Sequence, residues 1–300
     1  MSHLPEIPLT ETTNPATTRI DTMPTLDVLR LINTEDQRVP LAVATQLDAI
    51  AAAADVIYAR MRRGGRLIYV GAGTSGRLGV VDASEMPPTY NTPHGQVVGL
   101  IAGGERAMFR TAEGAEDDPS LGAGDIMQLN VNEHDAVVGI AASGRTPYVV
   151  GALNEARSRG AATISIACTQ PAAIHAASDI AITLLTGPEV VTGSTRMKAG
   201  TATKLVLNMI STTVMIKLGK TFGNLMVDVQ PSNAKLRDRA RRIIAAATGV
   251  SRDEAHALLE RCGDVKTAIV VALVGCTPDE ARERLRKAEG RVARALEKRL

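Results

Sequence analysis

The sequence predicts an α/β protein built on a doubly wound, five-stranded parallel sheet. Two observations lead to this fold class. Short apolar runs alternate with longer segments of helical spacing, and such an alternation is typical of parallel sheets with helices on both faces. The chain also has 300 residues, 45% hydrophobic and 22% charged, which is enough for a sizeable core. The predicted strands are 66–70, 97–102, 136–142, 162–168 and 180–186.

The segments on either side of these strands also have interpretable patterns. Residues 1–22 are rich in Thr and Pro and are expected to form an extended arm, and residues 24–62 have the apolar spacing of helices. Beyond the fifth strand, the apolar run 205–216 is closed by Lys204 and Lys217. It is too short to cross a bilayer and predicts a core or interface helix.

Only helices are predicted from about residue 231 onward, and their ends are marked by capping signals. These signals are Ser251 with Glu254, Gly263, Asp264, and Thr277 with Glu280. We therefore expect an arm (1–22), a sheet domain that includes the N-terminal helices (23–230) and a helical subdomain (231–300). Its 249–300 part weakly resembles a ubiquitin-associated-like three-helix unit, which implies a way of packing and not ubiquitin binding.

Composition excludes several classes of function. The net charge is +2 and the basic residues after Lys235 alternate with acids, so we expect no nucleic acid partner. The chain has no Trp and two Phe, which disfavours base-stacking platforms. Three cysteines and five histidines lack metal-ligand spacing, so no metal site is predicted. The cysteine usage and the absence of a secretory signal predict a cytoplasmic protein without a membrane part.

The glycine-rich turn GAGTSG (71–76) follows the first strand and has the spacing of a dinucleotide-binding turn. That function requires an acid at the end of the second strand, where Glu105 comes too late. Its first helix should also run on unbroken, whereas Pro87 and Pro88 are expected to stop this one. We therefore favour a phosphate monoester and expect no organic cofactor.

Three turns that follow strands share one character: 73–76, 143–147 and 192–201 each place hydroxyls next to glycine at a predicted helix start. Free N–H groups and the helix dipole favour an anion there, although Ser and Thr are also ordinary N-caps. Since parallel strands end at one sheet edge, the turns predict one phosphate site. The candidate residues are Gly73, Thr74, Ser75, Gly76, Ser143, Gly144, Arg145, Thr146, Ser194, Thr195, Arg196 and Lys198.

Two glutamates are candidates for catalysis. Glu85 follows the first glycine turn and is expected near the end of a short helix, among apolar neighbours where an idle carboxylate would be costly. Glu116 follows the second strand and precedes Asp117 and Asp118. A solvated acidic turn is a sufficient explanation for these two aspartates.

Four segments resemble the N-acetylmuramic acid 6-phosphate etherase family, a branch of the sugar isomerase (SIS) domain family. They are LIYVGAGTSGRLGVVDASEMPPTY, GLIAGGERAMFRTAEGAED, VGIAASGRTPYV and EVVTGSTRMKAGTATKLVLNM. The resemblance implies a flavodoxin-like SIS fold and a homodimer with its active site near the subunit boundary. It also implies that Glu85, of the DASE motif, and Glu116, which closes AEGAE, are the acid/base pair. Ala141 stands where the wider SIS family usually has the first serine of its phosphate loop.

The implied reaction cleaves a D-lactyl ether at C3 of a sugar phosphate by elimination followed by addition of water, without metal or cofactor. One group must take the C2 proton and another must protonate the leaving oxygen, which explains a pair of carboxylates. Lys198 or Arg196 is a candidate for stabilising the enolate-like intermediate. The rival hypothesis is a non-catalytic sugar-phosphate sensor like the glucokinase regulatory protein, which would have no use for an acid and a base together.

Overall fold

The computed structural model describes residues 7–110, 112, 114–229 and 234–297. The chain divides into two compact units: residues 1–84 with 95–211, and residues 85–94 with 212–300. The expected domain boundaries at 22, 230 and 249 stay predictions, and residues 1–6, 231–233 and 298–300 of the expected arm and subdomain lie outside the described residues.

The first unit contains the predicted five-stranded parallel sheet. Its strands are β1 (Leu67–Gly71), β2 (Val97–Ile101), β3 (Ala136–Ile140), β4 (Ala162–Ala167) and β5 (Ile180–Thr183). They lie in the order β2-β1-β3-β4-β5 and every neighbouring pair is parallel. This order is flavodoxin-like and reverses between β1 and β3, which is where ligands bind in such sheets.

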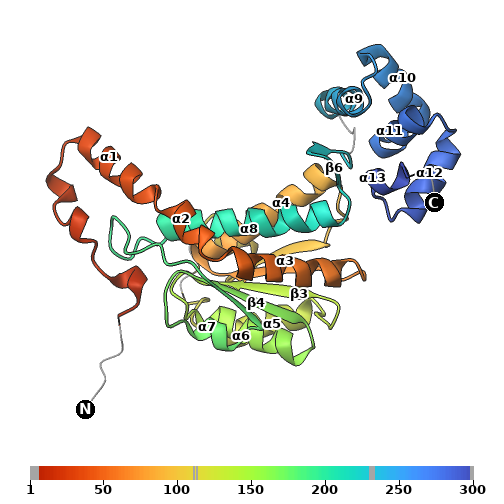
Figure 1. The fold of residues 1–300 in the computed structure, drawn as a ribbon. Coiled ribbons are helices and arrows are strands. Elements are labelled where there is room, and N and C mark those ends of the chain that lie inside the picture. Colours follow the sequence, from red (N-terminus) through yellow and green to blue (C-terminus); the bar gives the residue numbers. More distant parts are fainter. Residues whose placement is uncertain (1–6, 111, 113, 230–233, 298–300) are drawn as a thin grey trace. The chain divides into compact units, whose positions relative to one another are not determined.

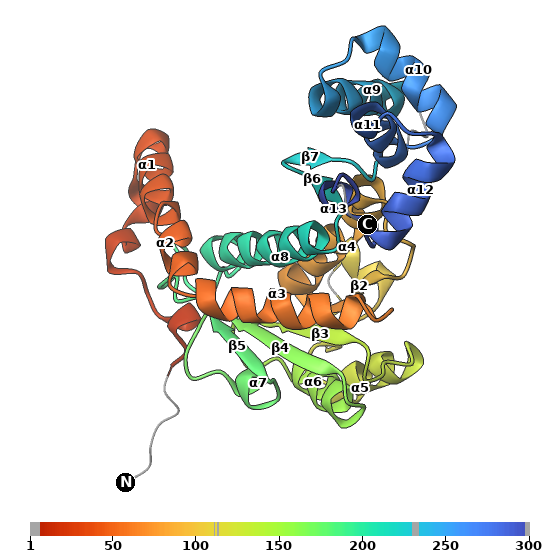
Figure 2. The ribbon, with the colours of Figure 1, turned by 45° about the vertical axis from the view of Figure 1, so that its right-hand side comes forward.

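Helices cover both faces of the sheet, as the doubly wound prediction requires. Helices α5 (Pro119–Gln128), α6 (Pro147–Ser158) and α7 (Ala173–Ala176) lie on one face, and α3 (Leu47–Met61), α4 (Gly73–Tyr90) and α8 (Lys198–Lys217) lie on the other (Figure 1, Figure 2). The core on the α6 side joins Val70 and Val137 of the strands to Tyr148 and Leu153 of the helix.

The segment before the sheet is folded in short pieces. The arm, from residue 7 onward, forms the 3-10 turns η1 (Leu9–Glu11), η2 (Pro15–Thr17) and η3 (Ile20–Thr22) instead of one extended run. It is held against the turn after β4, where the Leu9 N–H donates to Thr169 Oγ1 at 2.9 Å. The expected helices follow as α1 (Thr25–Asp36), α2 (Val39–Ala44) and α3.

In the described part of the chain, no single helix is long and apolar enough to cross a membrane, although the bent pair Thr25–Ala44 and Leu47–Met61 meets the length and composition criteria when taken together.

Helix α4 corrects one expectation from the sequence. Pro87 and Pro88 lie inside the helix, which continues to Tyr90 instead of stopping before them. The prolines fall near the C-terminal end, so only two N–H donors are lost, and the Asn91 N–H still donates to the Pro87 carbonyl at 2.9 Å. The prolines therefore do not distinguish this turn from a dinucleotide turn. The acid after β2 still does, because Glu105 begins η4 (Glu105–Met108) after two glycines.

The second unit contains a small hairpin, β6 (Thr221–Phe222) with β7 (Leu225–Met226), and the helices α9 (Ala234–Thr248), α10 (Arg252–Cys262), α11 (Val265–Val274), α12 (Pro278–Lys287) and α13 (Val292–Ala295). Both predicted capping boxes are confirmed at the starts of α10 and α12. Gly263 ends α10 in the left-handed conformation and Asp264 caps α11, also as predicted. These helices share one core that includes Ile244, Leu259, Ile269 and Leu285.

Candidate functional site

A cleft of about 170 Å³ lies at the carboxyl edge of the sheet, beside the ends of the neighbouring strands β1 and β3. It is formed by the turn after β1, the turn after β3, the start of α8, the segment after β2 and the N-terminal arm. Its lining residues are Glu11, Ala72, Gly73, Thr74, Ser75, Glu116, Ala141, Ala142, Ser143, Thr146, Thr195, Gly200 and Thr203. Residues from all three predicted turns therefore meet in one cleft.

The N-terminus of α4 opens into this cleft. The amide N–H groups of Gly73, Thr74 and Ser75 have no acceptor among the described residues, whereas the Gly76 N–H donates to the Ala72 carbonyl at 3.2 Å. Three free donors at the positive end of an 18-residue helix favour a bound anion. The hydroxyls of Thr74 and Ser75 line the same space.

Gly76 serves packing and does not line the cleft. A Cβ atom on Gly76 would lie 2.6 Å from the Gly71 carbonyl oxygen and 2.7 Å from Ile101 Cγ1. Such contacts are too close for any other residue, so glycine lets α4 approach the strands. The dinucleotide-like spacing of the glycines thus reflects in part the close packing of helix on sheet.

The turn after β3 contributes hydroxyls without using them as helix caps. Thr146 precedes α6, yet its side chain makes no capping hydrogen bond, and with Ser143 it lines the cleft. Gly144 has a positive φ of 70°, and a Cβ there would lie 2.5 Å from Ala172 Cβ. Arg145 is exposed to solvent and does not line the cleft.

The start of α8 is already occupied by a carboxylate of the protein. Glu189 accepts the backbone N–H groups of Lys198 at 3.0 Å and of Ala199 at 2.9 Å. Burial raises the pKa of Glu189 even though these two bonds favour its charged form. This helix end is therefore not open to an anion. Of the predicted Ser194 to Lys198 loop, only Thr195 lines the cleft.

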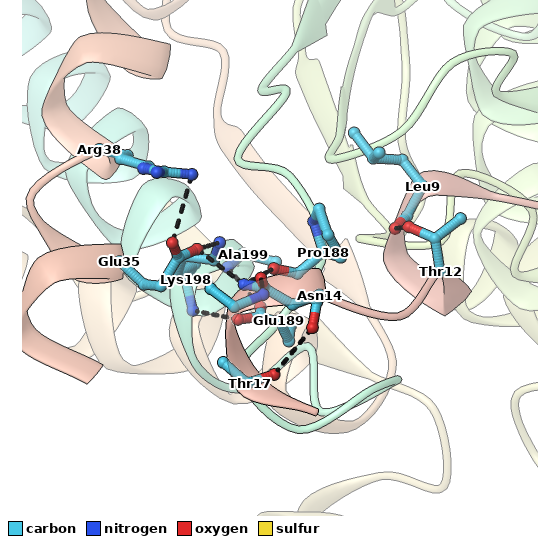
Figure 3. A network of polar contacts seen from close by, with 11 residues as sticks. Leu9, Thr12, Asn14, Thr17, Glu35, Arg38, Pro188, Glu189, Lys198 and Ala199 are labelled. Atoms are coloured by element: carbon cyan, nitrogen blue, oxygen red, sulfur yellow. Dashed lines mark hydrogen bonds and ion pairs between the residues drawn. The ribbon is translucent and has the colours of Figure 1, made fainter. Parts of the chain in front are cut away.

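Lys198 makes a buried ion pair with Glu35 (Figure 3). It is not among the residues that line the cleft. Its Nζ lies 2.5 Å from Glu35 Oε2, and the two side chains are 1% and 2% exposed. Asn14 donates to the same carboxylate at 3.0 Å, and Arg38 lies 3.2 Å from its other oxygen. Burial acts to raise the pKa of Glu35, but the bond to Lys198 and the nearby positive charges outweigh it, so the pKa is lowered. The other proposed cation, Arg196, is exposed and outside the lining.

The two glutamates proposed for catalysis lie in different surroundings. Glu116 lines the cleft, and its backbone carbonyl accepts the Tyr148 N–H at 3.0 Å, which ties this segment to the start of α6. Glu85 lies twelve residues after Gly73 on α4, about 18 Å along the helix axis, and is not among the lining residues. Asp118, expected to be merely solvated, caps α5 by accepting the Ser120 N–H at 2.8 Å.

The expectation that Glu85 lies in an apolar environment was wrong. Its side chain is exposed, and the buried acid of the DASE motif is Asp82, which is 4% exposed. Asp82 accepts hydrogen bonds from Tyr69 at 2.8 Å, Asn208 at 2.7 Å and Ser211 at 3.1 Å. Asp82 and Glu85 thus lie about one turn apart on the same helix, one buried and one exposed to solvent. The helical period of 3.6 residues can tell the two carboxylates apart only when it is known which side of the helix faces the core.

Glu11 of the arm is a lining residue that the sequence did not reveal. A Cβ on Gly193 would lie 3.2 Å from Glu11 Oε2, so the glycine leaves room for this carboxylate. The described lining therefore holds two carboxylates, Glu11 and Glu116, and no Lys or Arg. Within the described residues, no group of three or more His, Cys, Asp or Glu side chains could hold a metal ion.

This chain is similar to known proteins over almost its full length. It is 56% identical to the N-acetylmuramic acid 6-phosphate etherase of Cutibacterium acnes over 99% of this chain and 98% of that protein. The enzyme of the same name from Streptomyces coelicolor is 56% identical over 96% and 93%, and that of Pectobacterium atrosepticum is 53% identical over 96% and 95%.

Family models and solved structures give shorter or more distant matches. The SIS domain model matches residues 121–213, and the model of the glucokinase regulatory protein N-terminal SIS domain matches residues 49–157. Among solved structures, a phosphoheptose isomerase from Neisseria gonorrhoeae aligns with a TM-score of 0.49 and 16% identity over 63% of this chain and 98% of that one.

Proposed function

Because the chain belongs to the N-acetylmuramic acid 6-phosphate etherase family, we propose that it cleaves the D-lactyl ether of N-acetylmuramic acid 6-phosphate. The products are N-acetylglucosamine 6-phosphate and D-lactate, and the reaction belongs to cell-wall amino-sugar recycling. We class the enzyme as a carbon-oxygen lyase that acts in the cytoplasm. The full-length likeness is to etherases, whereas the regulatory-protein model matches only residues 49–157, so nothing favours the sensor hypothesis.

The observation that carries this proposal is a cleft that combines neutral donors with an acid. The free amides of Gly73, Thr74 and Ser75 and the hydroxyls of Ser143 and Thr146 are suited to the oxygens of a phosphate monoester. Glu116 lines the same cleft and can reach a sugar held by its phosphate. The remaining predicted binding residues (Gly76, Gly144, Arg145, Ser194, Arg196 and Lys198) do not line the cleft, and any effect they have on binding would be indirect.

The reaction follows from the chemistry of the open-chain sugar. The C1 aldehyde acidifies the C2 proton, so a carboxylate base can remove it while the C3–O bond breaks and lactate leaves with a proton. Water then adds to the conjugated aldehyde, placing a hydroxyl on C3 and a proton on C2. Glu116 is one of the two acid/base groups in this proposal.

Glu85 is the other acid/base group, and we assign it to the neighbouring subunit's cleft. Its side chain is solvent-exposed and does not line the cleft of its own chain. A homodimer could bring the partner subunit's Glu85 to Glu116. Support comes from exposed apolar side chains that a second subunit could cover, namely Leu26, Leu29, Leu41, Val81 and Met209.

The activity is tested by incubation with N-acetylmuramic acid 6-phosphate in heavy-oxygen water. We expect D-lactate and label at C3 of the sugar, and release of lactate without that label would contradict the elimination mechanism. Glu85→Gln and Glu116→Gln should each lower turnover by about two to four orders of magnitude while product binding is kept. Asp117→Asn, an exposed neighbour outside the lining, is the matched control.

Mixing the two inactive variants tests whether Glu85 acts across the dimer. Random re-association makes half of the dimers mixed, and each mixed dimer would have one intact site. Activity should therefore return to roughly a quarter of the wild-type value. No recovery in mixed dimers would show that Glu85 does not act in the partner's cleft.

A further inference from the structure

A second, smaller hollow adjoins the cleft. It has a volume of about 80 Å³ and shares Ala72, Gly73 and Glu116 with the cleft. The rest of its described lining consists of Arg77, Ala102, Ala107 and Ala112. Glu116 therefore lies at the junction of two spaces, one with hydroxyl and amide donors and one with a guanidinium and methyl groups.

Arg77 is held in place by two backbone carbonyl groups. It lies one turn after Gly73 on α4 and is half-buried. Its Nε donates to the Met108 carbonyl at 3.0 Å and its Nη2 to the Ala107 carbonyl at 2.8 Å. A guanidinium has five N–H donors, so these two bonds leave three of them. No carboxylate in the described part of the chain pairs with it, and a guanidinium partly removed from water favours an anion.

We propose that this hollow binds the carboxylate of the substrate's lactyl group, with Arg77 contacting the carboxylate oxygens and the alanine methyls facing the lactyl methyl. The inference rests on the proposed function, which supplies a substrate with two anionic groups. The cleft offers neutral donors for the phosphate, and the hollow offers the cation that the described lining of the cleft lacks.

The position of Glu116 supports this arrangement. With the sugar in the cleft and the lactyl group in the hollow, the ether bond must pass the junction that Glu116 lines. A carboxyl group there is suited to give its proton to the departing lactyl oxygen. Arg77 would then select for the lactyl-bearing sugar and orient its leaving group, since a planar guanidinium recognises a carboxylate through paired hydrogen bonds.

The test uses two ligands that cannot react. Reduction of the substrate at C1 gives an alditol phosphate without the aldehyde needed for elimination, and the second ligand is the same alditol without its lactyl group. By calorimetry we expect the wild type to bind the lactyl-bearing alditol about 10- to 100-fold more tightly, the value of a hydrogen-bonded charge pair. Arg77→Gln should abolish this difference and Arg77→Lys should restore part of it. Arg106→Gln is the control, because Arg106 is an exposed neighbour that lines neither space.

Each other outcome overturns a specific claim. Equal loss of affinity for both alditols in Arg77→Gln would mean that Arg77 only supports the 105–108 segment, and the inference would be wrong. Equal affinities in a wild type that releases D-lactate would refute the inference and leave the proposed function standing. A wild type that neither binds the alditols nor releases lactate would refute the proposed function itself. Thermal unfolding checks that Arg77→Gln is folded. If Arg77→Gln does not fold, the affinities of Arg77→Lys for the two alditols provide the comparison with the wild type.

Discussion

Neutralising Glu35 is expected to destabilise the fold, because its carboxylate forms a buried ion pair with Lys198. The sequence made Lys198 a candidate for stabilising a reaction intermediate, whereas the structure places its ammonium 2.5 Å from Glu35 with both side chains almost fully buried. Removing one member of such a pair leaves an uncompensated charge in the interior. Glu35→Gln is therefore expected to lower the free energy of unfolding by about 3 to 5 kcal/mol.

Lys198→Met should lower the free energy of unfolding by less than Glu35→Gln, because the carboxylate of Glu35 keeps two other partners. Asn14 lies 3.0 Å from one of its oxygens and Arg38 lies 3.2 Å from the other. We expect a loss of about 1 to 3 kcal/mol. Replacing both members by Met and Leu should recover most of the stability, since apolar residues of similar volume often replace a buried pair without loss.

Urea denaturation followed by circular dichroism measures these differences through the midpoint. Lys204→Met, exposed on the same helix, is the control and should stay within about 0.5 kcal/mol of wild type. The pKa of Glu35 is lowered from 4.5, so the pair contributes fully above that pH and its contribution fades in more acidic solution as the carboxylate takes up a proton. A Lys198→Met variant that is as stable as wild type but has lost turnover would refute this assignment and return Lys198 to the active site.

Three further outcomes are expected from single changes. Ser143→Ala should weaken N-acetylglucosamine 6-phosphate binding by about 10-fold in calorimetry, and unchanged affinity would argue against phosphate at that turn. Glu11→Ala should raise KM by about 3- to 10-fold with little change in kcat, as expected for a carboxylate that accepts a hydrogen bond from the sugar. Asp21→Ala, on the same arm, is the control and should leave KM unchanged. Equal KM values in the two variants would show that Glu11 does not contact the substrate. Burial lowers the pKa of His175 from 6.5, so the unfolded chain takes up a proton first as the pH falls and stability is lost below that value. The urea midpoint of His175→Gln should therefore depend less on pH than that of the wild type between pH 6.5 and about pH 5. The same pH dependence in both proteins would show that His175 is not its cause.

Much of the fold could be predicted from the sequence because its signals are local. Each predicted strand exists, and the turns after β1 and β3 meet at the predicted sheet edge. The caps at Ser251 and Thr277 are confirmed, since a capping box involves residues only three apart. Proline is a local signal too, yet Pro87 and Pro88 misled because a helix close to its end can lose two donors without breaking.

The membership of the site depended on contacts between distant parts of the chain. Lys198 and Glu35 are 163 residues apart, and the Leu9 N–H that holds the arm is 160 residues from Thr169. Neither contact could be predicted from the periodicity of the sequence, because periodicity reports on neighbouring residues and not on which distant side chains are buried together. The sequence alone therefore determined the sheet, its ligand-binding edge and the helix ends, which follow from hydrogen bonds and burial within a few residues. Only the tertiary structure decided that Glu11 and Glu116 line the cleft, that Lys198 is buried and that Glu85 faces solvent, because burial of a charge depends on which partners the fold brings to it.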